Sequence, residues 1–335
     1  MTLASQRHDD VSGIDAASAS HYKLQCPRCS AALGVLPETG PRVDAVLNCS
    51  NCLLRIRSDR GIWRTLSPER ESRYERFMAE YQIVRQKEGR GSNSAEYYVA
   101  LPYRDVTGNN QSQWTIRGRT FRYLERNVLS KLERAHPDGM DVLDMGAGNG
   151  WLSYRLALRG HRPVAVDLLV NDTDGLGAAA HYRTTLPYLF PRFQAELDRL
   201  PFADDQFDCA IYNASFHYSE NYERTLKEAL RCVRSGGTVI VCDTPWYKDD
   251  RSGRQMVEER RAAFLAKFGF PSDGIASREY LTDRMLINLE RRCGIRWRVE
   301  TPFYGIRWAL RPLLARLRGR REPSRFRIYL AEVRK

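Results

Sequence analysis

From residue 141 onward, short apolar runs alternate with stretches in which apolar residues recur every three or four positions. Short apolar runs predict buried strands, and the longer spacing predicts amphipathic helices. Predicted strands cover 142–145, 163–166, 193–196, 207–213 and 238–243. Helices starting at Trp151 and near Tyr222 fall between them. This alternation predicts an α/β fold built around a parallel sheet.

Two helical stretches precede this region. The first carries an apolar stripe of Tyr74, Phe77, Met78, Tyr81 and Val84. A polar break follows at 89–94, and the second stretch carries the stripe Phe121, Leu124, Val128 and Leu132 and ends near Pro137. Between them, the loop 103–114 is rich in Asn, Gln and Gly. This loop is either a lid over a pocket or a plain connector.

A third helical pattern lies near the C-terminus. Its stripe is Ile306, Leu310, Leu313, Leu314 and Leu317, interrupted by Pro312. Arginines stand beside the stripe at 307, 311, 316, 318, 320 and 321. A basic amphipathic element can bind phosphate backbones or acidic lipid surfaces. We favour the alternative of a packed helix with a solvated arginine face.

Four of the eight cysteines form two C-x-x-C pairs, Cys26 with Cys29 and Cys49 with Cys52. Two such pairs present four thiolates to one tetrahedral Zn²⁺, and the 30–48 interval suits a β-hairpin between them, with a turn at 37–41 and a strand at 43–47. Because four cysteines leave no open coordination position, the metal is expected to be structural. The other four cysteines are scattered, which is typical of reduced cysteines in a cytoplasmic protein.

The composition is that of a globular protein, with 335 residues, 42% of them hydrophobic. The formal net charge of +12 fits a nucleic acid or an anionic membrane as partner, or only an arginine-rich composition, which we favour. No apolar run is long enough to predict a transmembrane segment. Residues 1–20 are polar and lack the apolar core of a signal peptide, so a disordered tail is predicted there.

A glycine-rich turn follows the first predicted strand, in the order Asp144-x-Gly146-x-Gly148-x-Gly150. Glycines let the backbone approach a ligand closely. A carboxylate at the strand end would repel a pyrophosphate, but it suits a ligand with an ammonium and a sulfonium group. Asp167 ends the next strand, where an acid can accept both hydroxyls of a ribose. The pattern therefore predicts a nucleoside site at the strand ends.

The region from about Met140 to Asp243 resembles the class I, or type 11, S-adenosylmethionine-dependent methyltransferases. The matching segments are V-L-D-M-G-A-G-N-G, D-R-L-P-F-A-D-D-Q-F-D and L-R-C-V-R-S-G-G. The resemblance implies a Rossmann-like sheet of seven strands, whose antiparallel sixth and seventh strands would be 296–302 and 326–333. The front half looks like the Trm112-type zinc modules fused to some bacterial members.

The resemblance also implies roles for individual residues. Asp144 with the turn Gly146, Ala147 and Gly148 would hold the methionine part of S-adenosylmethionine. Asp167, with Leu168 beside it, would bind the ribose. Glu196 would accept from the adenine amino group, with the Leu197 backbone reaching the ring. Asn213, at the end of the fourth strand, would lie near the transferred methyl group. Ser235 stands where the family usually has proline, and Glu196 where it more often has aspartate.

A general base is not essential for methyl transfer, since alignment alone can lower a barrier by about 7–11 kcal/mol. His217, just after the fourth strand, is the first candidate base, although a histidine there can equally pack the pocket wall. Asp243, at the end of the fifth strand, is the second candidate.

The predicted organisation is a tail over 1–22, a zinc ribbon over 23–66, a helical linker or lid over 67–137 and a Rossmann-like methyltransferase domain over 138–335. For the acceptor we favour a small or lipid-linked molecule. The alternatives are an RNA base, reached with the zinc module and the basic surface, and a non-catalytic scaffold whose zinc module binds a protein partner.

Overall fold

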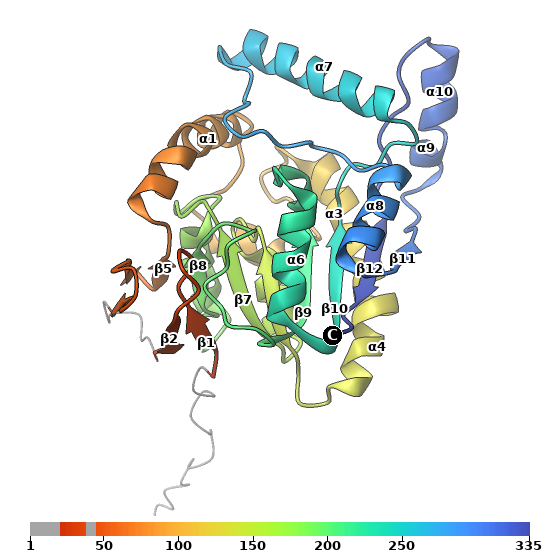
Figure 1. Cartoon of the computed structure of the whole chain (residues 1–335). Coiled ribbons are helices and arrows are strands. Elements are labelled where there is room, and N and C mark those ends of the chain that lie inside the picture. The colour runs from red at the N-terminus through yellow and green to blue at the C-terminus, as the bar shows by residue number, and fades with distance from the viewer. Residues whose placement is uncertain (1–20, 38–44) are drawn as a thin grey trace, which may run out of the picture.

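The predicted strands form the centre of one mixed sheet in the computed structural model, which describes residues 21–37 and 45–335 (Figure 1). Among these residues the sheet has ten strands in the order β11-β12-β10-β9-β6-β7-β8-β5-β4-β3. The bounds of the seven strands contributed by the chain from residue 141 onward are β6 Asp141–Met145, β7 Arg162–Asp167, β8 Arg192–Gln194, β9 Phe207–Asn213, β10 Val233–Cys242, β11 Trp297–Glu300 and β12 Ile328–Glu332.

These seven strands confirm the expected Rossmann-like sheet. β8, β7, β6, β9 and β10 pair in parallel, and β12 pairs antiparallel with β10. β11 is antiparallel to β12 and therefore runs in the same direction as β10. The expectation that both last strands are antiparallel to the rest is thus wrong for β11.

Helices cover both faces of the sheet, because alternate residues of each strand point to opposite faces. In β6, Leu143 and Met145 belong to the core that also contains α6 (Tyr222–Cys232) and α8 (Asp283–Cys293). Val142 belongs to the second core. The helices of that second core are α2 (Ala95–Ala100), α3 (Gln111–Leu124), α5 (Trp151–Ala157) and the 3₁₀ helix η3 (Leu176–Thr184).

The front of the chain extends the central sheet. β5 (Ile62–Arg64) pairs in parallel with β8, and β4 (Arg55–Asp59) and β3 (Val46–Asn48) continue beyond it. Trp63 stacks on Phe193 with ring centroids 6.4 Å apart, and Tyr22 stacks on Phe207 at 5.1 Å. We call residues 21–66 the front module and the chain from residue 141 onward the α/β region. The described residues of the front module share one hydrophobic core with the α/β region.

Each C-x-x-C pair forms the turn of its own hairpin. β1 (Lys23–Gln25) pairs with β2 (Ala32–Val35) around the first pair, and β3 pairs with β4 around the second. Among the described residues β2 and β3 belong to different sheets, so the hairpin expected between the two pairs is wrong. The turn predicted at 37–41 and the start of the strand predicted at 43–47 lie outside the described residues.

The predicted tail also lies outside the described residues, except for residues 21 and 22. Tyr22 is buried, and its hydroxyl donates to the Asp141 carboxylate at 3.0 Å.

Both predicted helical stretches before the α/β region are confirmed. α1 spans Pro68–Lys87, and α3 continues as η1 (Glu125–Leu129), α4 (Ser130–Leu132) and η2 (Glu133–Ala135). Figure 1 shows α1 and α7 (Asp250–Phe268) lying beyond one end of the strands. Among the described residues, no helix is long and apolar enough to cross a bilayer.

The arginine-rich helix near the C-terminus is interrupted as predicted, into α9 (Ile306–Ala309) and α10 (Arg311–Leu317). Neither segment contains a buried residue. The expectation of a packed helix is therefore wrong, because the leucines of its stripe face solvent instead of a core.

Candidate cofactor pocket

A pocket of about 850 Å³, part of it open to solvent, lies at the carboxyl ends of β6, β7 and β9. Ligand sites of α/β sheets lie at this edge, where the strand order reverses direction. In this sheet the reversal falls at β6, since the chain adds β7 and β8 on one side of it and β9 and β10 on the other. Eight predicted cofactor residues line the pocket: Asp144, Gly146, Ala147, Gly148, Asp167, Leu168, Leu197 and Asn213.

The glycine turn after β6 needs its glycines. Gly146 and Gly148 have φ of +75° and +55°, a region that residues with a Cβ rarely adopt. A Cβ on Gly146 would collide with the side chain of Ser215, at the end of β9. The backbone N–H of Gly148 donates to Asp167 Oδ2 at 2.8 Å, which ties the turn to the end of β7.

Two carboxyl groups of the pocket are strongly affected by burial. Burial raises the pKa of Asp144 to about 7, although Asp144 Oδ2 accepts hydrogen bonds from the backbone N–H and the hydroxyl of Ser153. Burial likewise raises the pKa of Asp167 to about 6, partly offset by the N–H groups of Gly148 and Leu169. A cationic ligand would favour the ionised form of both groups.

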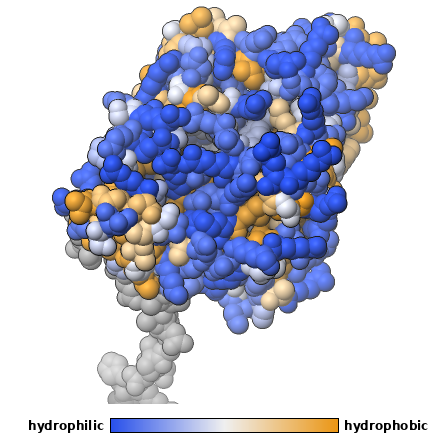
Figure 2. All heavy atoms as spheres, viewed as in Figure 1, coloured by the Kyte–Doolittle hydropathy of each residue, from blue (hydrophilic) through white to orange (hydrophobic). Residues whose placement is uncertain are grey.

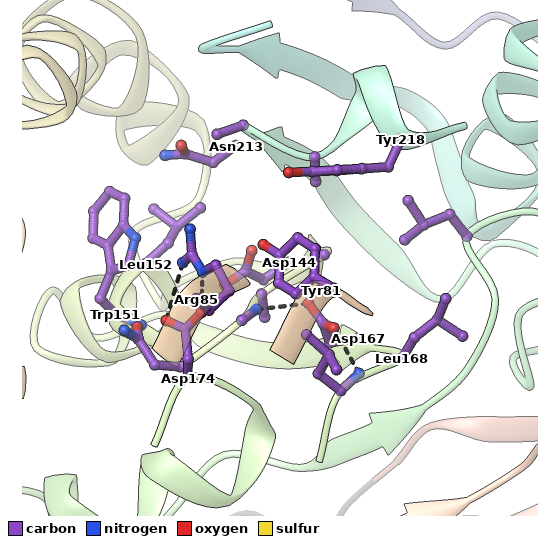
Figure 3. A pocket seen from close by; sticks show the side chains of 18 of the residues that line it. Tyr81, Arg85, Asp144, Trp151, Leu152, Asp167, Leu168, Asp174, Asn213 and Tyr218 are labelled. Carbon is purple, nitrogen blue, oxygen red and sulfur yellow. Dashed lines mark hydrogen bonds and ion pairs between the residues drawn. The ribbon is translucent and has the colours of Figure 1, made fainter. Parts of the chain in front are cut away.

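Helix α1, which lies in the segment predicted as a helical linker or lid, forms a wall of the pocket. Phe77, Tyr81 and Arg85 line the pocket from one side of this helix. Tyr81 packs edge-on against Tyr218 with ring centroids 5.7 Å apart, and Figure 3 shows Arg85 and Asp174 pointing toward each other. The amphipathic stripe predicted the helix, but only the tertiary structure shows which element it covers.

In the loop predicted at 103–114, residues 103–110 do not line this pocket. Residues from 111 onward belong to α3 instead, and Trp114 and Arg117 of that helix do line it. The Arg117 guanidinium lies over the Trp114 ring at 5.0 Å from its centroid. Within the described ranges Arg117 forms no ion pair, and burial together with the nearby Arg90 and Arg85 lowers its pKa. Arg117 thus brings to the pocket a positive charge that has no direct ion-pair partner among the described residues, although Asp243 lies close enough to favour its charged form.

Glu196 lies outside the pocket lining, unlike the other predicted cofactor residues. Its carboxylate accepts hydrogen bonds from the Arg70 guanidinium and, at 2.9 Å, from the Tyr74 hydroxyl, both on α1. The side chain is 4% exposed. Here Glu196 fastens α1 to the end of β8, and nothing in its position supports the predicted contact with adenine.

Two of the three predicted catalytic residues, Asn213 and Asp243, lie at neighbouring strand ends, and His217 lies in the 3₁₀ turn Phe216–Tyr218 after β9. Of the three, only Asn213 lines the pocket. Asn213 ends β9 opposite Cys242 of β10, and Asp243 follows Cys242 directly. Asp243 and Ala214, the residues just past β10 and β9, have φ of +52° and +54°. Such backbone is strained for residues other than glycine, and strain of this kind clusters at functional sites.

Each of the three predicted catalytic residues also has a buried polar atom without a hydrogen-bond partner. Among the described residues, Asn213 Nδ2, His217 Nδ1 and Asp243 Oδ2 have no hydrogen-bond partner. Such orphans are rare in folded proteins and call for a ligand, water or ion. Asp243 Oδ1 accepts a hydrogen bond from the Thr120 hydroxyl at 2.6 Å.

The pKa values of the two candidate bases reverse the ranking expected from the sequence, in which His217 came first and Asp243 second. Burial lowers the pKa of His217 to about 3, with Arg117 and Arg260 adding to the effect. Burial raises the pKa of Asp243 to about 6. Since a general base works best with a pKa near the operating pH, Asp243 is the better candidate.

The four cysteine sulfurs of the front module gather at one point. The Sγ atoms of Cys26, Cys29, Cys49 and Cys52 all lie within 4.8 Å of one another, and none of these cysteines is in a disulfide. Bonds of about 2.3 Å to a tetrahedral Zn²⁺ place sulfurs roughly 3.8 Å apart. The cluster therefore has a donor set and a size that fit zinc.

Comparison with known proteins agrees with this geometry. Residues 143–241 match the family model described as Methyltransferase domain. The demethylmenaquinone methyltransferases of Mycobacterium marinum and Mycobacterium tuberculosis are each 34% identical over 122 residues, which make up 36% of this chain and 48% and 47% of theirs. The chain thus spans about half the length of the curated relatives it matches.

Solved structures also resemble the chain, at low sequence identity. The 1,6-didemethyltoxoflavin-N1-methyltransferase of Burkholderia thailandensis is 15% identical, with a TM-score of 0.45 over 89% of this chain and 99% of that chain. An S-adenosylmethionine-dependent methyltransferase from Mesorhizobium loti is 22% identical, with a TM-score of 0.41 over 62% and 99%. The family match covers residues 143–241, the part of the chain that contains most of strands β6 to β10.

Proposed function

We propose that this protein transfers a methyl group from S-adenosylmethionine to a small or lipid-linked acceptor. The observation that carries the proposal is the pocket itself. A glycine turn and two buried acids meet there at the reversal point of a sheet whose core matches the methyltransferase family. Fold alone does not give function, but these groups match the charges of the cofactor.

The charged groups of the pocket fit the amino-acid end of the cofactor. That end carries an ammonium and a carboxylate. Asp144 would pair with the ammonium and Arg117 with the carboxylate, since Arg85 is already paired with Asp174. Asp167 would bind the ribose hydroxyls, while Leu168 and Leu197 would flank the adenine ring.

When bound, the cofactor supplies a methyl group already activated by its sulfonium. The protein's own task is to align the acceptor and, where needed, to remove its proton. Asn213 would hold the acceptor close to the methyl group. Asp243 would accept the proton through its Oδ2, which has no partner among the described residues, although neither Asp243 nor His217 belongs to the pocket lining. Tyr81 and Phe77 of α1 would exclude water from the pocket.

We further propose that the four cysteines hold a structural Zn²⁺. A Trm112-like role in binding a protein partner, a cytoplasmic location and the domain boundaries set out above remain predictions of the sequence. RNA as acceptor rests on the zinc module and the basic charge. The scaffold alternative conflicts with the presence of both Asp144 and Asp167 in the pocket.

Calorimetry with S-adenosylmethionine and S-adenosylhomocysteine tests the proposal, because binding of either needs no knowledge of the acceptor. We expect one site per chain with a micromolar dissociation constant. Absence of binding to the zinc-loaded protein would contradict the proposed activity and favour a scaffold.

A further inference from the structure

The segment 303–321, here called the C-terminal hairpin, exposes an unusual group of apolar side chains. Its large apolar residues are 42% to 76% exposed: Phe303, Ile306, Leu310, Leu313, Leu314 and Leu317. Single exposed leucines are ordinary on protein surfaces, but a contiguous group marks an interaction site. In Figure 2 apolar residues lie at the corner of the molecule where Figure 1 places α10.

The hairpin is held firmly at its base, so the exposed face has a fixed position. Trp308 stacks on Phe326 with ring centroids 5.6 Å apart, and the Arg311 guanidinium lies over the Trp308 ring. The backbone carbonyl of Tyr304 accepts a hydrogen bond from Arg119 of α3. The apolar residues therefore project from an anchored element.

The charge of the hairpin is of one sign. Residues 303–321 contain six arginines and no acidic residue. Arg321 pairs with Glu259 of α7, whereas Arg307, Arg316 and Arg318 are exposed and form no ion pair within the described ranges. A second copy of this chain would bring the same positive charge to the contact. An anionic surface into which leucine side chains can insert is complementary to both the positive charge and the exposed apolar residues of the hairpin.

The hairpin also adjoins the catalytic end of the sheet. The Tyr304 hydroxyl lies 2.9 Å from the Thr120 hydroxyl, which in turn donates to Asp243. A surface bound by the hairpin would therefore lie on the acceptor side of the site.

From these contacts we propose that the C-terminal hairpin binds the surface of an anionic lipid bilayer, with its leucines in the headgroup region and its arginines on the lipid phosphates. Resting on the proposed methyltransferase function, the proposal also names the acceptor class, an amphiphile that enters from the bilayer toward Asp243.

Vesicle sedimentation tests the proposal with the full, zinc-loaded chain. Vesicles of phosphatidylcholine alone are compared with vesicles of phosphatidylcholine and phosphatidylglycerol in equal parts. We expect binding to the anionic vesicles only, weakened by salt. The double variant L313S/L317S should bind at least about tenfold more weakly, and R316Q/R318Q about tenfold or more, since each basic residue near such a surface is worth about 1 kcal/mol, or roughly fivefold in affinity.

Matched controls separate the hairpin from general surface effects. L158S removes a leucine that is 50% exposed at the end of α5, and R126Q/R134Q removes the same charge from exposed arginines elsewhere. Both controls should bind as the parent protein does.

Four results would overturn the proposal. They are no binding of the parent protein to anionic vesicles, equal loss of binding in the controls, a dimer that L313S/L317S dissociates, and arginine-dependent binding of RNA without binding of vesicles. Calorimetry with S-adenosylhomocysteine on the same samples keeps the two proposals apart. L313S/L317S should bind the nucleoside normally even if the proposed bilayer contact is wrong.

Discussion

Arg85 of α1 and Asp174 of the segment after β7 form a buried ion pair on the wall of the cofactor pocket. Arg85 Nη2 donates to Asp174 Oδ1 at 3.0 Å, with a second hydrogen bond from Nε, and the two side chains are 15% and 6% exposed. This pair, together with Arg70 and Glu196, fastens the covering helix to the sheet. Of the two pairs that attach this helix, Arg70 with Glu196 lies outside the pocket lining and Arg85 with Asp174 lies in it.

The first prediction concerns this pair. D174N should destabilise the protein by about 3 kcal/mol and weaken binding of S-adenosylhomocysteine about tenfold or more, because removing one partner leaves a buried charge unpaired. Thermal melts and calorimetry measure the two effects. The matched control is D172N, which removes the exposed pair of Asp172 with Arg60 and should cost less than about 1 kcal/mol. If D174N and D172N had equal effects, the proposed role of the Arg85–Asp174 pair in stability and ligand binding would be contradicted.

A second prediction concerns Asp167. D167A should abolish measurable binding of the cofactor while circular dichroism stays unchanged, because the carboxylate is the proposed ribose partner and, among the described residues, otherwise accepts hydrogen bonds only from the backbone N–H groups of Gly148 and Leu169. 5′-Methylthioadenosine, which keeps the ribose, should lose affinity to the same extent. Unchanged affinity for either nucleoside would refute the ribose assignment.

Arg117 provides the third prediction. R117Q should weaken binding of S-adenosylhomocysteine by about tenfold or more, because a charge-assisted hydrogen bond to the ligand's carboxylate is lost. Binding of 5′-methylthioadenosine, which has no carboxylate, should remain as it was. Unchanged affinity for S-adenosylhomocysteine would contradict the proposed pairing of Arg117 with the carboxylate of the cofactor.

The fourth prediction is a pH dependence. In the free pocket Asp144 has a pKa of about 7 and is protonated below that pH. Pairing with the ligand's ammonium requires the ionised form. Affinity for S-adenosylhomocysteine should therefore rise about tenfold per pH unit as the pH increases toward 7, and then level off. In D144N this dependence should disappear; a slope that persists in the variant would assign it to another group.

The fifth prediction concerns the cysteine cluster. Cys26→Ser, or removal of zinc by a chelator, should lower the melting temperature of the whole chain, because Tyr22 and Trp63 share a core with Phe207 and Phe193. The loss of one zinc per chain is measured by metal analysis. A separate early transition, with the α/β region melting as before, would show instead that the front module unfolds independently.

Much of the α/β region could be predicted from the sequence, since the information there is local. A buried strand, a glycine turn and an acid at a strand tip are each encoded within a few residues. The parallel order of strands then brings Asp144, Asp167 and Asn213 to one edge. The residue pattern alone predicted only that the ligand is a nucleoside. The resemblance to methyltransferases indicated which nucleoside, S-adenosylmethionine.

The structure decided which distant segments meet. The resemblance implied that Glu196 binds adenine. In the structure its carboxylate accepts a hydrogen bond from Arg70, which lies 126 residues earlier in the chain. The order of the candidate bases depends on burial, which lowers the pKa of His217 and raises that of Asp243, and burial is a property of the whole fold.

The leucines of the C-terminal hairpin likewise show the difference between what local sequence predicts and what tertiary contacts decide. Their spacing determined that a helix forms and where Pro312 interrupts it. Whether its apolar stripe would be packed or exposed depended on the presence of a partner surface, and the described part of the chain provides none. Local periodicity fixes the backbone of an element, because hydrogen bonds and side-chain directions repeat along it. What covers that element is fixed only by contacts between residues far apart in the chain.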